Sequence, residues 1–134
     1  MFSAFIFSKL YHYPEKAKFT TMISDETRDK VISFFETIDK YYGCKTEITE
    51  GLYSRYENFD ANVTTWNLSE FTLIRSAYRR IGDRLMMEGE KMYYEISAKF
   101  IVDFKQPGRN TYEFVELYGS DVYRITKVKF NSKY

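Results

Sequence analysis

The sequence has few of the residues that build metal and covalent sites. Its 134 residues include one cysteine, Cys44, and one histidine, His12. A single cysteine excludes a disulfide within the chain and is typical of a reducing compartment. The zinc sites that several Cys or His ligands form are also excluded within one chain. We therefore expect no metal, no cofactor and a cytoplasmic location.

Long apolar runs and a strong net charge are missing as well. No stretch approaches the roughly 18 consecutive apolar residues of a membrane-spanning helix. The opening MFSAFIFSKL lacks the basic start, the length and the cleavage site of a signal peptide. Twenty Lys and Arg against nineteen Asp and Glu leave a net charge of +1, too small to attract nucleic acid or anionic lipid over the whole molecule. The sequence therefore predicts no membrane binding, and any basic site must be local.

Aromatic residues are abundant instead, with thirteen tyrosines and twelve phenylalanines. Tyrosine offers a large, fairly rigid contact area with a polar tip, which suits both partner binding and the rim of a small core. The content of 44% apolar and 29% charged residues is typical of a folded protein. We expect a single domain over residues 1–134. Residues with AT-rich codons dominate, which indicates an AT-rich genome such as those of many phages and low-GC bacteria.

The first half of the chain predicts a strand, a helix and further strand structure. The apolar run within residues 2–13 predicts a central strand covered on both faces. Ser24 is a favourable N-cap for a helix that Gly43 would end. Residues 45–59 contain β-forming residues interrupted by Gly51, which predicts one bent strand or two short ones.

A second helix is predicted to begin at Asn67 and to end at Gly89. Asn67 is a suitable N-cap, Glu70 stands at the N3 position of a capping box, and Trp66 is placed to pack on Phe71. Both local signals of a helix start therefore occur together.

From Lys91 onward the hydrophobic period changes to two, which predicts strands with one buried and one exposed face. Three antiparallel strands are expected at residues 91–105, 110–118 and 121–130, joined by Pro-Gly and Gly-Ser turns. The order β-α-β-α-β-β-β predicts an α+β fold, with a mostly antiparallel sheet and two helices packed on one face.

The stretch TLIRSAYRRIGDRL holds the densest cluster of one charge, namely Arg75, Arg79, Arg80 and Arg84. On a helical wheel of the predicted helix, the buried stripe consists of Phe71, Ile74, Tyr78, Ile81 and Leu85. Arg75 and Arg79 lie beside this stripe, whereas Arg80 and Arg84 point away from it. Acidic residues follow at the spacing of weak surface ion pairs, Asp83 after Arg79 and Glu88 after Arg84. The favoured interpretation is a solvated helix face. The alternative is that Arg75 and Arg79 present their guanidinium groups to a partner's carboxylate or phosphate.

One catalytic alternative rests on the segment IVDFK, which places Asp103 and Lys105 two residues apart on a predicted strand. Metal-dependent nucleases of the PD-(D/E)xK type use such a pair to hold a divalent cation and steady the attacking water. No second acidic ligand is identifiable, because Glu95 lies eight residues away, roughly 26 Å along an extended strand. Ordinary polar alternation is therefore favoured over a nuclease.

A second alternative is nucleic-acid binding by the exposed face of the predicted meander. Tyr93, Lys99 and Lys105 lie on that face and Arg109 lies beside it. Basic residues and tyrosines that alternate on a sheet can stack and neutralise single-stranded nucleic acid. Acidic residues in the same strands dilute the positive charge.

The sequence favours a small non-enzymatic module that docks on another protein. Walker, Rossmann, nucleophile-elbow and EF-hand motifs are absent. The composition suits an accessory or inhibitor protein of a phage or mobile element that binds a host or virion protein, and a homo-oligomer is compatible with it. The predicted binding residues are Arg75, Arg79, Arg80, Arg84, Tyr93, Lys99, Lys105 and Arg109.

Overall fold

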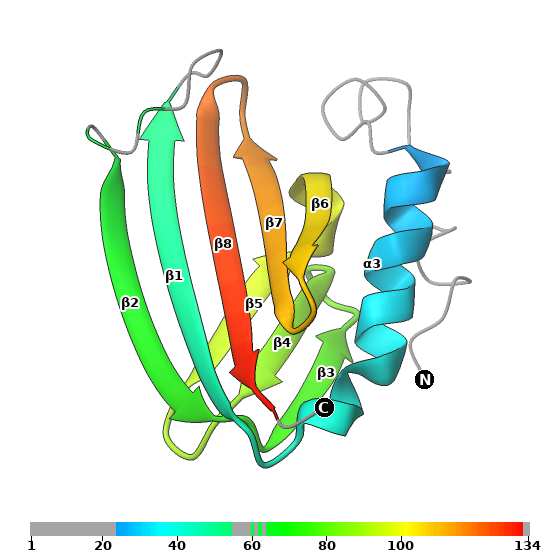
Figure 1. Ribbon diagram of the computed structural model, residues 1–134. Coiled ribbons are helices and arrows are strands. Elements are labelled where there is room, and N and C mark those ends of the chain that lie inside the picture. The colour runs from blue at the N-terminus through cyan, green and yellow to red at the C-terminus, as the bar shows by residue number, and fades with distance from the viewer. Residues whose placement is uncertain (1–23, 55–59, 61, 63, 133–134) are drawn as a thin grey trace.

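The computed structural model describes residues 24–54, 60, 62 and 64–132, which form one helix and two antiparallel sheets (Figure 1). The described elements, in chain order, are α3 (Asp25–Thr37), the 3-10 turn η1 (Ile38–Tyr41), β1 (Lys45–Ser54), β2 (Thr65–Thr72), β3 (Arg75–Arg79), β4 (Arg84–Glu88), β5 (Tyr93–Ser97), the 3-10 turn η3 (Ala98–Phe100), β6 (Ile101–Gly108), β7 (Thr111–Tyr118) and β8 (Val122–Asn131). The predicted strand within residues 2–13 lies outside the described residues.

The larger sheet has five strands in the order β2-β1-β8-β7-β6, and the smaller sheet has three in the order β3-β4-β5. Every pair of neighbouring strands is antiparallel. The small sheet and α3 both cover the face of the large sheet that carries Ile48, Phe114, Val128 and Phe130, and together they bury one core. The fold is therefore α+β and mostly antiparallel, as the sequence predicts.

The predicted first helix is confirmed. The hydroxyl of Ser24 accepts a hydrogen bond from the amide of Thr27 at 3.0 Å, which caps the N-terminus. Its buried side chains recur at helical spacing, and the ring of Phe34 lies 4.4 Å from that of Tyr112 and 5.5 Å from that of Phe114. The chain leaves the helix through η1, and Gly43 turns it into β1 with a φ of +91°.

Residues 45–54 form one continuous strand although Gly51 lies inside it. The indole of Trp66 on the neighbouring strand packs against the bare backbone, so a methyl group added at Gly51 would lie 2.8 Å from that ring. Glycine is needed here because the aromatic ring occupies the place of its side chain.

The predicted second helix is wrong, because residues 65–88 form β2, β3 and β4. The side chain of Asn67 does not cap a helix but donates across the sheet to Glu50 at 3.3 Å. Leu85 and Met87 are fully buried two residues apart, which is strand spacing, while Ile81 of the expected buried stripe is 86% exposed. Eight residue pairs with β1 hold β2 in the large sheet, and this pairing outweighs the local helix signals.

The strand predicted at residues 91–105 is divided, and its two halves belong to different sheets. The turn η3 separates β5 from β6 and reverses the alternation, so that Ile96 and Ile101 are both buried. The strands predicted at residues 110–118 and 121–130 are confirmed as β7 and β8. One described helix followed by eight strands thus replaces the predicted order with two helices.

Candidate functional site

The eight residues predicted to bind a partner are distributed over several parts of the fold. Arg75, Arg79, Arg84 and Tyr93 lie on the small sheet, Arg80 in the β3–β4 turn, Lys99 in η3, Lys105 on β6 and Arg109 in the β6–β7 turn. The residues of the face predicted for nucleic acid do not belong to one sheet, since η3 places β5 and β6 in different sheets.

Three of the four clustered arginines form ion pairs across strands of the small sheet. Arg75 donates to both carboxylate oxygens of Glu88, at 2.7 and 3.2 Å, and this hydrogen bonding lowers the pKa of Glu88. Arg79 and Arg84 share the carboxylate of Glu95, with N–O distances of 2.6 and 3.2 Å. The helical pairs Arg79–Asp83 and Arg84–Glu88 predicted from sequence are therefore wrong, and cross-strand neighbours replace them.

The turn between β3 and β4 is held in a defined conformation. Gly82 and Asp83 both adopt positive φ angles, of 91° and 52°. The carbonyl of Asp83 accepts from the amide of Ala98 at 2.9 Å, and its carboxylate accepts a short hydrogen bond from the hydroxyl of Tyr78. A non-glycine residue with positive φ is uncommon, and these contacts hold it in place.

This ordered turn presents an apolar side chain to solvent. We define the hairpin tip as residues 79–84, where Ile81 is 86% exposed. Arg79 and Arg84 flank the turn with side chains 47% and 42% exposed, and Arg80 forms no ion pair with a described residue. Sequence analysis missed Ile81 because the helical wheel placed it in the buried stripe. The dipeptide Gly82-Asp83 was the one signal of a turn.

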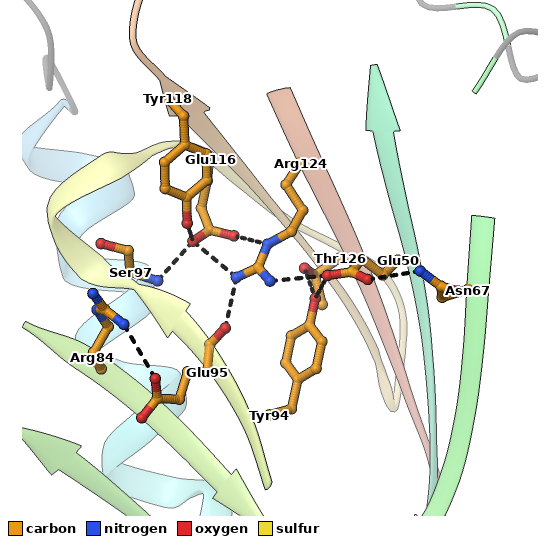
Figure 2. A network of polar contacts seen from close by, with 10 residues as sticks. All are labelled: Glu50, Asn67, Arg84, Tyr94, Glu95, Ser97, Glu116, Tyr118, Arg124 and Thr126. Atoms are coloured by element: carbon orange, nitrogen blue, oxygen red, sulfur yellow. Dashed lines mark hydrogen bonds and ion pairs between the residues drawn. The ribbon is translucent and has the colours of Figure 1, made fainter. Parts of the chain in front are cut away.

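A polar network lies between the two sheets (Figure 2). The carboxylate of Glu116 on β7 is fully buried and accepts from the amide of Ser97 at 2.7 Å and from the hydroxyl of Tyr118 at 2.6 Å. Arg124 on β8 donates to the same carboxylate at 2.8 and 3.1 Å. The guanidinium also reaches the Glu50 carboxylate at 2.9 Å.

This network completes the free edge of β5. Among the described strands, β5 has β4 as its single neighbour, so the backbone groups on its other side need partners. The amide of Ser97 donates to Glu116, and the carbonyl of Glu95 accepts from Arg124 at 2.6 Å. One ion pair of the large sheet thus satisfies two backbone groups at the edge of the small sheet.

A recess of about 340 Å³ opens beside the network, with Arg84, Tyr94 and Tyr118 among its lining residues. Burial raises the pKa of Tyr94 and of Tyr118, so both hydroxyls stay neutral at physiological pH. Over the described part of the chain, no buried side-chain nitrogen or oxygen lacks a hydrogen-bond partner. The arrangement therefore links the two sheets through satisfied hydrogen bonds.

Asp103 and Lys105 lie together on β6 and face solvent, which is the side of the strand where the favoured interpretation of polar alternation places them. Their side chains are 45% and 65% exposed and form an ion pair with each other at 3.7 Å. Within the described residues, no group of three or more His, Cys, Asp and Glu side chains could hold a metal ion. Cys44 is half-buried against the core, and His12 lies outside the described residues.

No family model, no curated protein and no solved structure matches this chain. Among the helices of the described residues, none has the length and apolar character needed to cross a membrane.

Proposed function

We propose that the protein is a non-enzymatic binding module that docks on another protein through the hairpin tip. The observation that carries this proposal is the exposure of Ile81 on a turn fixed by its own hydrogen bonds. Full burial of an isoleucine side chain contributes roughly 1.5–3 kcal/mol. A turn that is already ordered loses little further conformational entropy on binding, which favours this position as an anchor.

The charges around the tip define the chemistry of the partner. Three arginines and the carboxylates of Asp83 and Glu95 leave one positive charge, which Arg80 displays toward solvent without an ion pair to a described residue. Arginine is also enriched among the residues that dominate binding energy at protein interfaces. The complementary surface is an apolar socket large enough for Ile81 and rimmed by carboxylates.

The test compares Ile81→Ser with Leu68→Ser in quantitative capture of partners from an extract of the native host. Leu68 is a matched control because it is 71% exposed, on β2 of the other sheet. We expect Ile81→Ser to weaken capture at least about tenfold, since the lost burial exceeds about 1.4 kcal/mol, and Leu68→Ser to leave it unchanged. Equal capture by wild type and Ile81→Ser, with equal thermal stability, would contradict docking through the tip.

The alternatives require separate assays. Nucleic-acid binding predicts a shift in oligonucleotide mobility at low salt that disappears steeply as salt rises. A nuclease centred on Asp103 predicts metal-dependent cleavage that Asp103→Ala abolishes. The origin in a phage or mobile element and the inhibitor role remain predictions from composition.

A further inference from the structure

A second basic site lies away from the hairpin tip, between η1 and the β6–β7 turn. A recess of about 450 Å³ is lined there by Lys40, Tyr41, Arg109 and Asn110. Neither Lys40 nor Arg109 forms an ion pair with a described residue, and no described carboxylate lines the recess. The recess therefore gathers two positive charges without a described counter-charge.

The walls of this recess are fixed. The hydroxyl of Tyr41 donates to the side-chain oxygen of Asn110 at 2.9 Å, and the ring of Tyr41 stacks on that of Phe130 with centroids 3.9 Å apart. The side-chain amide of Gln106 donates to the carbonyl of Arg109 at 2.9 Å, which holds the turn. Both cations therefore project from backbone that is ordered before any ligand arrives.

The charge in the recess selects the class of ligand. Burial raises the pKa of Tyr41, so its hydroxyl stays neutral and adds no negative charge beside the cations. Lysine supplies a compact ammonium with three donors, and arginine supplies a planar fork that matches two oxygens of a phosphate. A doubly charged oxyanion between Lys40 and Arg109 would neutralise both groups and remove the repulsion between them.

We propose that this recess binds a small phosphate-bearing ligand, held by Lys40 and Arg109. Its volume falls within the roughly 300–1,000 Å³ of small-molecule sites and leaves room for an organic group beside the phosphate. The proposal is independent of docking through the hairpin tip, because the two sites share no residue.

Inorganic phosphate and phenyl phosphate are the probes, titrated separately into the full chain and followed by NMR shifts of the backbone amides near Lys40 and Arg109. We expect saturable shifts at these amides, and about tenfold weaker binding when either cation is replaced by glutamine, since each supplies a charge-assisted contact. Tighter binding of phenyl phosphate would assign the site to organic phosphates, and equal binding would assign it to inorganic phosphate. Both results support phosphate binding by Lys40 and Arg109.

The matched control is the double variant Lys91→Gln with Lys127→Gln, which loses the same charge at positions outside the recess. It should bind phosphate as the wild type does, whereas Lys40→Gln with Arg109→Gln should not bind it. Thermal melting checks that both double variants remain folded. The proposal is overturned if neither phosphate binds to wild type, if both double variants weaken binding equally, or if an oligonucleotide binds while both phosphates fail.

Discussion

Replacement of Glu116 by alanine tests how the two sheets are held together. The buried carboxylate accepts four hydrogen bonds, one each from Ser97 and Tyr118 and two from Arg124. Removal of one partner of a buried ion pair costs about 3–5 kcal/mol, because the other charge stays buried. In Glu116→Ala, Arg124 keeps its contacts with Glu50 and the β5 backbone. We therefore expect a loss of stability at the lower end of this range, about 3 kcal/mol.

The measurement is urea unfolding of wild type and Glu116→Ala. With a slope of about 1–3 kcal/mol per molar urea, a loss of about 3 kcal/mol lowers the midpoint by roughly 1–3 M. Glu113→Ala is the matched control, because Glu113 lies on the same strand with its side chain on the opposite face and is not fully buried. The control should change the free energy of unfolding by no more than about 0.5 kcal/mol.

The double variant Glu116→Leu with Arg124→Leu tests which role the Glu116–Arg124 ion pair has. The pair either stabilises the fold only through its own two charges or also supplies hydrogen-bond partners to the edge of β5. Two apolar residues often replace a buried ion pair without loss of stability. Here they would leave the Ser97 amide and the Glu95 carbonyl without partners, so we expect the double variant to stay at least about 2 kcal/mol less stable than wild type. Wild-type stability in the double variant, or a cost below about 1 kcal/mol for Glu116→Ala, would refute the edge-completion argument.

Two further predictions concern packing and alkaline pH. Gly51→Ala should cost about 1–3 kcal/mol by overpacking against Trp66, whereas Gly108→Ala, with its nearest contact at 3.5 Å, should be tolerated in the same urea assay. Burial raises the pKa of Tyr94 and of Tyr118 above the usual value of about 10, so the unfolded chain releases these protons first. The stability they contribute is complete below pH about 10 and is lost as pH rises above it. Tyr118→Phe should flatten this decline in urea midpoints measured across alkaline pH, and an equally steep decline in that variant would contradict it.

The parts of the fold that follow from local sequence are predictable. Ser24 supplies the cap of α3, and the apolar residues of that helix repeat at one period only, so the helix follows directly from the sequence. Burial alternates along β7 from Thr111 to Glu116 and along β8 from Thr126 to Asn131, on either side of a Gly-Ser turn. In these elements the local preference of the residues and their tertiary packing favour the same secondary structure. Sequence patterns are then enough to predict the element.

Residues 65–88 show why the remainder is not predictable in the same way. Phe71, Ile74, Tyr78 and Leu85 fit a helical stripe, and Asn67 has the chemistry of a cap, so the local signals other than Gly82-Asp83 indicate a helix. What decides the outcome is pairing of β2 with β1 and of β4 with its two neighbours. The contacts between β2 and β1 join residues as far apart as Lys45 and Thr72, which no local window of sequence contains.

The polar network was predictable in part. Glu116 and Arg124 stand in phase with buried residues of their strands, such as Phe114 and Val128, and a charged residue at an inward position of a strand is a signal that sequence analysis can find. The role of the network could not be predicted from sequence. The backbone groups that it satisfies belong to β5, and the sequence pattern assigns β5 and β6 to one long strand. The edge that needs partners exists only once η3 separates these two strands.

Glu95 connects the network to the hairpin tip. Its carboxylate pairs with Arg79 and Arg84 at the base of the tip, while its carbonyl accepts from Arg124 on the large sheet. Loss of Arg124 or Glu116 would therefore loosen the strand that carries Glu95 and disturb the arginines that frame Ile81. The side chain of Ile81 itself contributes little to stability, because 86% of it is exposed. We therefore expect the proposed docking and the stability of the fold to be separable at Ile81 and coupled at Glu95.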